Sequence, residues 1–303
     1  QDVYLYTGFA PGPGWLYDQL SKNGRRMEGA YCTRLEPDMK TVKQEPVLVA
    51  PSVWNINGTG FEGHAFYEAS SIRKIGGRYY FVYSSILSHE LCYAVSDRPD
   101  GVFRYGGTLV DLGDLYTEGR EDETHARNYL GNTHGGMAEL NGSWYIFYHR
   151  QTNRHSYSRQ ACAERLERTP DGGFKQAEVT SCGLNGGPLA GVGEYQARIA
   201  CNLWSKEGTA RYDRKFDKAA HPYFTQDKKD DDHSATQYIA NLKDGAVAGF
   251  KYFRFENAGG IRVQAAGSAK GLLRVSIHED FADIPRRRSR WRPAAAWPGS
   301  ARN

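Results

Sequence analysis

Short apolar runs separated by turn residues make up most of this chain. The clearest example, FYEASSIRKIGGRYYFVYSS over residues 66–85, has two stretches of aromatic and β-branched side chains around a Gly-Gly pair. Stretches of this length, bounded by glycine, favour β-strands joined by a tight turn. Because such apolar runs and turns alternate along most of the chain, the pattern predicts an all-β protein in which helices are minor.

The strand pattern repeats within the chain. When the segment from Glu68 is placed over the segment from Thr133, an offset of 65 residues, the apolar and aromatic positions coincide without a gap. The identical positions are Gly77, Tyr80 and Tyr83, which fall on Gly142, Tyr145 and Tyr148. A period of tens of residues is typical of folds built from stacked supersecondary units.

Each repeat predicts four short antiparallel strands. In the middle repeat we expect them at about 69–75, 78–84, 90–96 and 102–110, and a Pro-Asp turn follows the third strand of each unit. Four strands per ~65 residues are typical of a blade of a β-propeller. A blade cannot bury both of its faces alone, so blades must stack. About two and a half blades can be recognised, fewer than the roughly four to eight of a closed propeller.

Composition and charge exclude several classes of protein. The chain has 303 residues, 40% hydrophobic, which is enough for a substantial core. Residues 281–303 hold six Arg and one Asp and so contribute +5 to the net charge of +4, leaving −1 for the rest. We therefore expect no nucleic-acid partner, and the lack of an apolar run of ~18 residues predicts no membrane span. We expect a monomer.

The sequence changes character after residue 182. Residues 183–235 are rich in Gly, Asp and Lys and predict a connector, whereas residues 236–280 alternate like the strands of a β-sandwich. The Arg-rich residues 281–303 predict a disordered tail.

The five cysteines show no metal-binding spacing. Their odd number leaves at least one thiol free. A cross-strand disulfide between Cys162 and Cys182 is one alternative, and buried free thiols are the favoured one.

The repeat brings two candidate functional residues to equivalent positions. Glu68 coincides with Thr133, next to His134, at the start of the innermost strand of adjacent units. In a propeller these strands line the central channel, so the two side chains are expected to converge. Taken alone, a strand glutamate is more often an ion-paired residue, here with Arg73 or Lys74, and a lone histidine is more often structural.

Three segments together resemble a known family. FYEASSIRKIGGRYYFVYSS, GNTHGGMAELNGSWYIFYHR and YSRQACAERLERTPDGGFKQAEVTSCG are similar to the second half of a glycoside hydrolase family 43 catalytic domain. The resemblance covers roughly residues 1–182 and implies a five-bladed β-propeller, of which about the last three blades are present. It implies an inverting enzyme that cleaves arabinofuranosyl or xylosyl linkages of plant polysaccharides, with galactosyl linkages as a further option.

The resemblance also implies site residues. Glu68 matches the general acid of the family, and His134 in NTHGG matches a histidine near a calcium or other cation at the channel centre. Arg159 in YSRQ matches an arginine that contacts the sugar. We expect His134 to contact substrate as well, and Phe66 to offer a sugar a flat aromatic surface. No cofactor is required, and a structural Ca²⁺ is the one ion implied.

Inverting hydrolysis needs two carboxyl groups ~6.5–9.5 Å apart, one acid and one base. In the family the base and a second, pKa-tuning Asp precede the segment that DVYLYTG resembles. We therefore expect a domain truncated at its N-terminus, with both Asp residues upstream of Gln1 and negligible hydrolysis by the chain alone. Residues 236–280 resemble the start of a family 6 carbohydrate-binding β-sandwich.

Two alternative functions stay open at the level of sequence. One is a non-catalytic glycan-binding propeller, in which Glu68 and His134 hold sugar or metal without turnover. The other is a related fructan-cleaving five-bladed propeller enzyme, which uses a retaining carboxylate pair. A polysaccharide substrate implies a secreted or periplasmic protein, although the chain shows no signal peptide.

Overall fold

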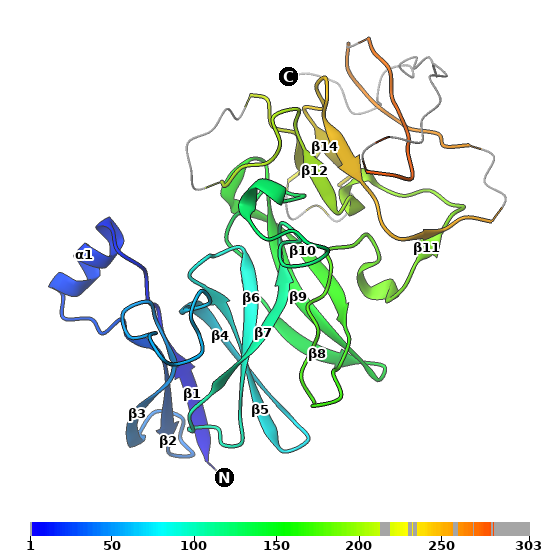
Figure 1. Ribbon diagram of the computed structural model, residues 1–303. Coiled ribbons are helices and arrows are strands. Elements are labelled where there is room, and N and C mark those ends of the chain that lie inside the picture. The colour runs from blue at the N-terminus through cyan, green and yellow to red at the C-terminus, as the bar shows by residue number, and fades with distance from the viewer. Residues whose placement is uncertain are drawn as a thin grey trace.

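The computed structural model describes residues 2–212, 219–229, 232, 235–256, 260–268, 270–279 and 281 (Figure 1). The elements within these residues are sixteen strands, one α-helix and three short 3-10 helices, so the mainly β prediction is confirmed. None of the described helices combines the length and the apolar character needed to cross a bilayer. The predicted Arg-rich tail, apart from Phe281, lies outside the described residues.

Three antiparallel sheets follow one another along the first half of the chain and lie side by side (Figure 1). Each sheet is a meander in which neighbours in sequence pair in space. Helix α1 (Trp15–Lys22) lies in the loop after the first strand and projects from the body (Figure 1). The strands are β1 (Val3–Thr7), β2 (Gly29–Leu35) and β3 (Val42–Pro51); β4 (Phe66–Ile75), β5 (Arg78–Ser85), β6 (Glu90–Ser96) and β7 (Arg104–Asp111); and β8 (Gly136–Leu140), β9 (Ser143–Thr152) and β10 (His155–Leu166).

The repeat seen in the sequence is a repeated hairpin. Gly77 and Gly142 lie in the β4–β5 and β8–β9 turns with φ of 89° and 77°, a backbone conformation that glycine adopts readily. The middle sheet has the four strands predicted for it. The third sheet has three, because the chain after β10 turns back toward β7, where the Ala177 N–H donates to the Leu109 carbonyl at 2.8 Å.

The middle sheet is buried on both faces. Side chains alternate across a strand, so Tyr80 and Val82 of β5 enter the core shared with the third sheet. Phe81 and Tyr83 enter the core shared with the first sheet. This double burial explains why the sequence of β5 is a continuous apolar run and not an alternation of apolar and polar residues.

The chain beyond residue 182 forms three two-stranded pairs. Each pair joins a strand of the predicted connector to a strand of the predicted sandwich, and a small cluster around Leu203 and Phe224 is shared by both segments. Strands on the two sides of residue 235 thus pair with each other, and no strand follows Arg254 within the described residues. The pairs are β11 (Leu189–Ala190) with β16 (Phe253–Arg254), β12 (Asn202–Trp204) with β15 (Val247–Gly249), and β13 (Tyr223–Gln226) with β14 (Gln237–Ala240). The 3-10 helices are η1 (Glu123–His125), η2 (Gly183–Asn185) and η3 (Ala197–Ile199).

The first strand of each large sheet stands at that sheet's edge. These three strands, β1, β4 and β8, contact one another, with β4 between the other two. Just beyond β1, the Ala10 N–H donates to the Tyr67 carbonyl of β4 at 2.8 Å. Side chains at the start of β4 and β8 are thereby brought to one place, although they are far apart in sequence.

All five cysteines are free thiols, and Cys32, Cys92 and Cys201 are buried. The free-thiol alternative is confirmed, because Cys162 and Cys182 are not bonded to each other.

Candidate active site

Glu68 and His134 meet across two sheets. His134 Nε2 lies 2.7 Å from Glu68 Oε1, which is hydrogen-bond distance for a carboxyl and an imidazole. The side chains are 23% and 38% exposed, respectively, so both groups remain open to solvent or to a ligand. The two side chains thus converge as the repeat predicted. The partner of the Glu68 carboxyl group is His134 rather than Arg73 or Lys74.

A β-bulge turns the start of β4 where Glu68 lies. The register of β4 on β5 shifts on both sides of Glu68, which stands opposite Ser84. Ala69, the next residue, has φ of 67°, a left-handed conformation that is uncommon for a residue with a Cβ. Bulges of this kind redirect single side chains and are frequent beside functional sites.

Two glycines let the start of β8 pack closely against β9 and β4, beside the Glu68–His134 contact. A Cβ on Gly135 would lie 1.9 Å from the Phe147 carbonyl oxygen, and one on Gly136 would lie 2.7 Å from Ser71 Oγ of β4. The first of these contacts is with backbone and cannot be relieved by a side-chain rotation. The Gly-Gly pair of the NTHGG motif is therefore explained by close packing of this segment against β9 and β4.

His149 of β9 holds the backbone of His134 in place. The His134 N–H donates to His149 Nδ1 at 3.2 Å, which leaves the ring proton on Nε2, facing Asn132 Oδ1 at 3.4 Å. Burial, with a smaller contribution from the positive charge of Arg159, lowers the pKa of His149 to about 4. His149 is therefore neutral at neutral pH and acts as a hydrogen-bond acceptor toward the site.

His149 is a site residue that the sequence interpretation missed. The signal was available, because His149 stands 65 residues after Ser84, the cross-strand neighbour of Glu68. It was missed because serine and histidine are chemically different, so this pair of positions does not stand out when the two repeats are aligned by their matching apolar residues.

Arg159 lies on β10 opposite Gln151 and is exposed. Its charge acts on His149, the residue that positions His134. Its side chain also lines a small cavity of about 30 Å³ that reaches Phe224 of β13. The structure thus places Arg159 beside the pair, on the side of His149.

Phe66 is in the core and not at the site surface. Its side chain is 0% exposed, and its ring lies 6.0 Å from that of Phe81 and 5.9 Å from that of Tyr83. The expectation that Phe66 offers a flat surface to a sugar is not supported, because the alternation of β4 turns this ring inward. The aromatic rings beside Glu68 that are only partly buried are Tyr67 and Phe9, with centroids 5.3 Å apart.

The donors around His134 do not match calcium. Ca²⁺ takes six to eight oxygen ligands. In the described part of the chain, the groups in contact with His134 are one carboxylate, from Glu68, and the imidazole of His149.

The chain belongs to glycosyl hydrolases family 43. The family model matches residues 5–174, more than half of the 303 residues, and this range contains β4, β8, the Glu68–His134 pair, His149 and Arg159.

Curated relatives carry names of the same kind. A xylosidase/arabinosidase of Thermoclostridium stercorarium is 46% identical over 275 residues, which cover 90% of this chain and 56% of the relative. A xylosidase/arabinosidase of Bacteroides ovatus is 33% identical over 162 residues, covering 49% of this chain and 44% of the relative. The chain thus spans about half the length of these relatives.

Solved structures of family 43 enzymes are also similar. A β-xylosidase/α-arabinofuranosidase from a compost microbial metagenome, solved with xylotriose in a calcium-free form, gives a TM-score of 0.42 at 22% identity, covering 57% of this chain and 53% of that chain.

Proposed function

We propose that this chain carries the acid side of a family 43 glycosidase site that acts on xylosyl or arabinofuranosyl linkages, with galactosyl linkages as a further option. The observation that carries the proposal is the Glu68–His134 contact at 2.7 Å, made by two separate sheets within the segment that matches the family. The names of the curated relatives support the choice of sugars.

Glu68 supplies the proton in this proposal. When His134 carries its proton on Nε2, it donates to Glu68 Oε1, and the acidic proton is then on Oε2. That oxygen can deliver the proton to the leaving glycosidic oxygen. Arg159 is proposed to contact the sugar, and His134 both orients Glu68 and contacts substrate.

The three meander sheets support a partial propeller. They stack through two apolar cores and turn their first strands toward one another, as blades do around an axis. We propose that they are blades of the five-bladed fold, and that the remaining blades and the base carboxylate belong to the part of the protein not contained in this chain. Hydrolysis by the 303 residues alone is accordingly expected to be negligible.

The test is release of nitrophenol from aryl β-xyloside, α-L-arabinofuranoside and β-galactoside by this chain and by Glu68→Gln, with xylotriose binding measured by calorimetry on both. Gln keeps the shape of the side chain but has no acidic proton. Any turnover above the solvent rate is expected to fall by about 10²–10⁴-fold, with binding retained.

Two results would contradict the assignment. Turnover that clearly exceeds the solvent rate and is equal in the parent chain and Glu68→Gln removes Glu68 from the acid role, and binding without any turnover, even in a longer protein with all blades, favours the glycan-binding alternative. NMR of the first-formed product anomer separates inversion from the retention expected of the fructan-cleaving alternative.

We further propose a monomer that works outside the cytoplasm, because polysaccharides are processed there. Light scattering of the purified chain tests the first statement, and cell fractionation with an antibody tests the second. Calcium dependence is tested by assaying binding with and without a chelator.

A further inference from the structure

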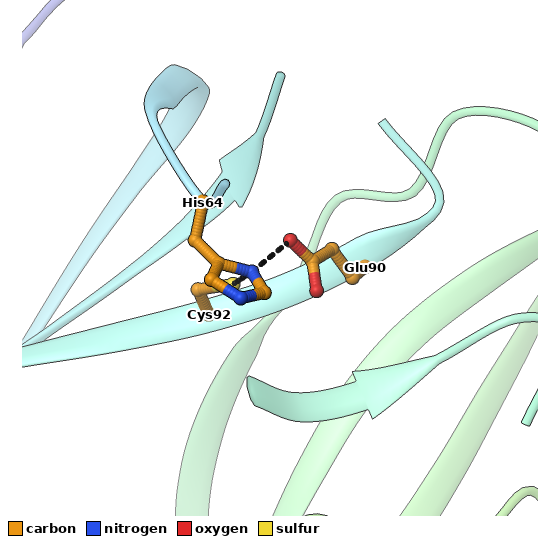
Figure 2. Close-up of side chains that lie close together, drawn as sticks. All are labelled: His64, Glu90 and Cys92. Carbon is orange, nitrogen blue, oxygen red and sulfur yellow. Dashed lines mark hydrogen bonds and ion pairs between the residues drawn. The ribbon is translucent and has the colours of Figure 1, made fainter. Parts of the chain in front are cut away.

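A second cluster of chemically reactive side chains lies on the sheet that carries Glu68 and in the loop before β4. His64, in the loop before β4, points toward Glu90 and Cys92 of β6 (Figure 2). One donor atom from each of these residues lies within 4.8 Å of the other two, and within the described residues this is the group of three that could hold a metal ion.

The fold brings these three donors together for simple reasons. Glu90 and Cys92 are two residues apart on β6 and therefore point to the same face of the sheet. His64 is positioned over that face by its backbone and its ring: the Tyr83 hydroxyl donates to the His64 carbonyl at 2.8 Å, and the ring of Tyr105 stacks on the imidazole at 4.8 Å.

The distances approach those of a metal centre. His64 Nδ1 lies 2.8 Å from Glu90 Oε1 and 3.9 Å from Cys92 Sγ. An ion bonded to a thiolate at ~2.3 Å and to an imidazole nitrogen at ~2.0 Å in tetrahedral geometry separates those two donors by about 3.6 Å. The nitrogen–carboxylate pair must open by about half an ångström and the nitrogen–sulfur pair must close by a few tenths of an ångström, and a rotation of the His64 side chain changes both distances.

The burial of the three residues suits a site with one open position. The side chain of Glu90 and the whole of Cys92 are 0% exposed, whereas the side chain of His64 is 24% exposed. An ion would therefore be held from below by the carboxylate and the sulfur and be reached by solvent from the side of His64. Three protein ligands with a fourth, solvent position are a common zinc arrangement.

We propose that His64, Glu90 and Cys92 form a binding site for a thiophilic divalent cation of the zinc type. The combination of sulfur, nitrogen and oxygen donors selects such an ion over calcium or magnesium, which take oxygen ligands. The ion replaces the hydrogen bond between Nδ1 and Oε1: His64 binds the ion as the neutral imidazole with its proton on Nε2, and the displaced Nδ1 proton passes to solvent.

The Cys92 thiol proton is released to solvent in the same step. A cysteine binds such an ion as the thiolate, so metal binding releases this proton. Ser85 Oγ, at 2.5 Å from Oε1, and Thr108 Oγ1, at 3.0 Å from Oε2, donate to the Glu90 carboxylate and keep it oriented as a ligand.

The site has a structural consequence for the loop that leads into β4. His64 precedes Glu68 by four residues, and Glu90 reaches β5 through Ser85, which pairs with Phe66. An ion here would fix the loop to the sheet beneath it. Binding is therefore expected to raise the midpoint temperature of unfolding.

The experiment is a titration of the purified, chelator-treated 303-residue chain with Co²⁺, followed by competition with Zn²⁺. We expect saturation at one ion per chain, with a near-ultraviolet charge-transfer band that reports cobalt bound to a thiolate and that Zn²⁺ removes. In Cys92→Ala the band should be absent and the affinity lower by at least about tenfold.

Cys32→Ala is the matched control, because Cys32 is a second buried cysteine in the same core. It should bind Co²⁺ as the parent chain does, and far-ultraviolet circular dichroism establishes that both variants are folded. Glu90→Gln, which keeps the hydrogen-bonding shape, should weaken binding but leave a band. An absent band in the parent chain, or an equal band in Cys92→Ala, overturns the proposal, and neither outcome depends on glycan binding or hydrolysis.

Discussion

Ala69 controls the direction of the candidate acid. It has a left-handed backbone conformation within the bulge of β4, directly after Glu68. A residue with a Cβ is strained in this conformation, and strain of this kind persists only where the surrounding structure enforces it. The strained residue thus directly follows Glu68, whose side chain must point toward β8 to reach His134.

Substitution of Ala69 tests this account. Valine is β-branched and tolerates a positive φ poorly, so Ala69→Val should lower the free energy of unfolding by about 1–3 kcal/mol. Ala69→Gly, which permits the same conformation, should leave stability within about 1 kcal/mol of the parent chain. Urea denaturation measures both, and equal stability of the two variants would show that the bulge does not require this backbone conformation.

Glu164 is a buried acid outside the site. It is 3% exposed on β10, and its Oε1 accepts from the Thr180 N–H at 2.8 Å and from the Tyr148 hydroxyl at 3.2 Å. Burial raises its pKa from 4.5 to about 7, although the bonds from Thr180 and Tyr148 oppose the rise. The folded protein thus retains this proton at pH values where the unfolded chain has lost it.

The sign of the resulting pH dependence follows directly. Stability from Glu164 is present below pH 4.5 and is lost as the pH rises from 4.5 to about 7, because only the unfolded chain ionises freely in that window. The loss attributed to this group is about 3 kcal/mol. In Glu164→Gln this part of the dependence should be absent, as measured by urea denaturation at pH about 4 and about 8. Parallel stability curves for the two proteins would contradict the assignment.

At the scale of elements, the crossing of β4 and β8 builds the site. Neither strand carries both groups, and each lies at the edge of its own sheet. Gly136 permits the approach, since a Cβ there would lie 2.7 Å from Ser71 Oγ of β4. The element pair, rather than either hairpin, is the unit that makes the Glu68–His134 contact.

An alanine at position 135, beside this crossing, should push the start of β8 away from β9. Gly135→Ala places a Cβ against the Phe147 carbonyl and should destabilise the fold by about 3 kcal/mol, with weaker xylotriose binding. Gly187→Ala is the control, because a Cβ there meets nothing within 4 Å. Thermal unfolding and calorimetry check both, and a Gly135→Ala protein as stable as Gly187→Ala would remove the packing explanation of the motif.

At the scale of the molecule, Arg150 joins the third sheet to the chain beyond residue 182. It is 5% exposed on β9, and its guanidinium donates to the carbonyls of Ala200 and Arg198, both at 2.6 Å. The guanidinium also lies 3.6 Å from the centre of the Phe224 ring. A single side chain therefore fixes η3 and β13 against β9.

Removal of this link should loosen the C-terminal part selectively. Arg150→Met leaves the two carbonyls without their donor and should lower the free energy of unfolding by about 2–4 kcal/mol. Hydrogen exchange should accelerate more in β12 to β15 than in β4 to β7, relative to the parent chain. Arg165→Met is the control, since Arg165 is exposed on neighbouring β10 and makes one long contact, 3.4 Å, to Gly186. Uniform acceleration across all sheets would show that Arg150 supports the whole fold instead.

How well the sequence predicts a structural feature depends on how far apart in the chain the residues that determine it lie. The four strands of the middle sheet and the Gly77 and Gly142 turns were predictable, because alternation and turn chemistry act over a few residues. The pairing of residues 183–235 with residues 236–280 was not, because short strands carry little periodicity and their partners lie far along the chain. Phe66 was misplaced because one step along a strand decides whether a ring faces the core or the site.

The sequence by itself determined the repeat, the mainly β fold and the identity of Glu68, His134 and Arg159 as candidates. These follow from local side-chain patterns and from motifs that are contiguous in the chain. Only the tertiary structure decided that His134 is the partner of Glu68, that His149 holds it, and that His64 approaches Glu90 and Cys92. The physical reason is that such contacts depend on how edge strands and loops of different sheets approach, and that approach is set by packing over the whole fold rather than by any one segment.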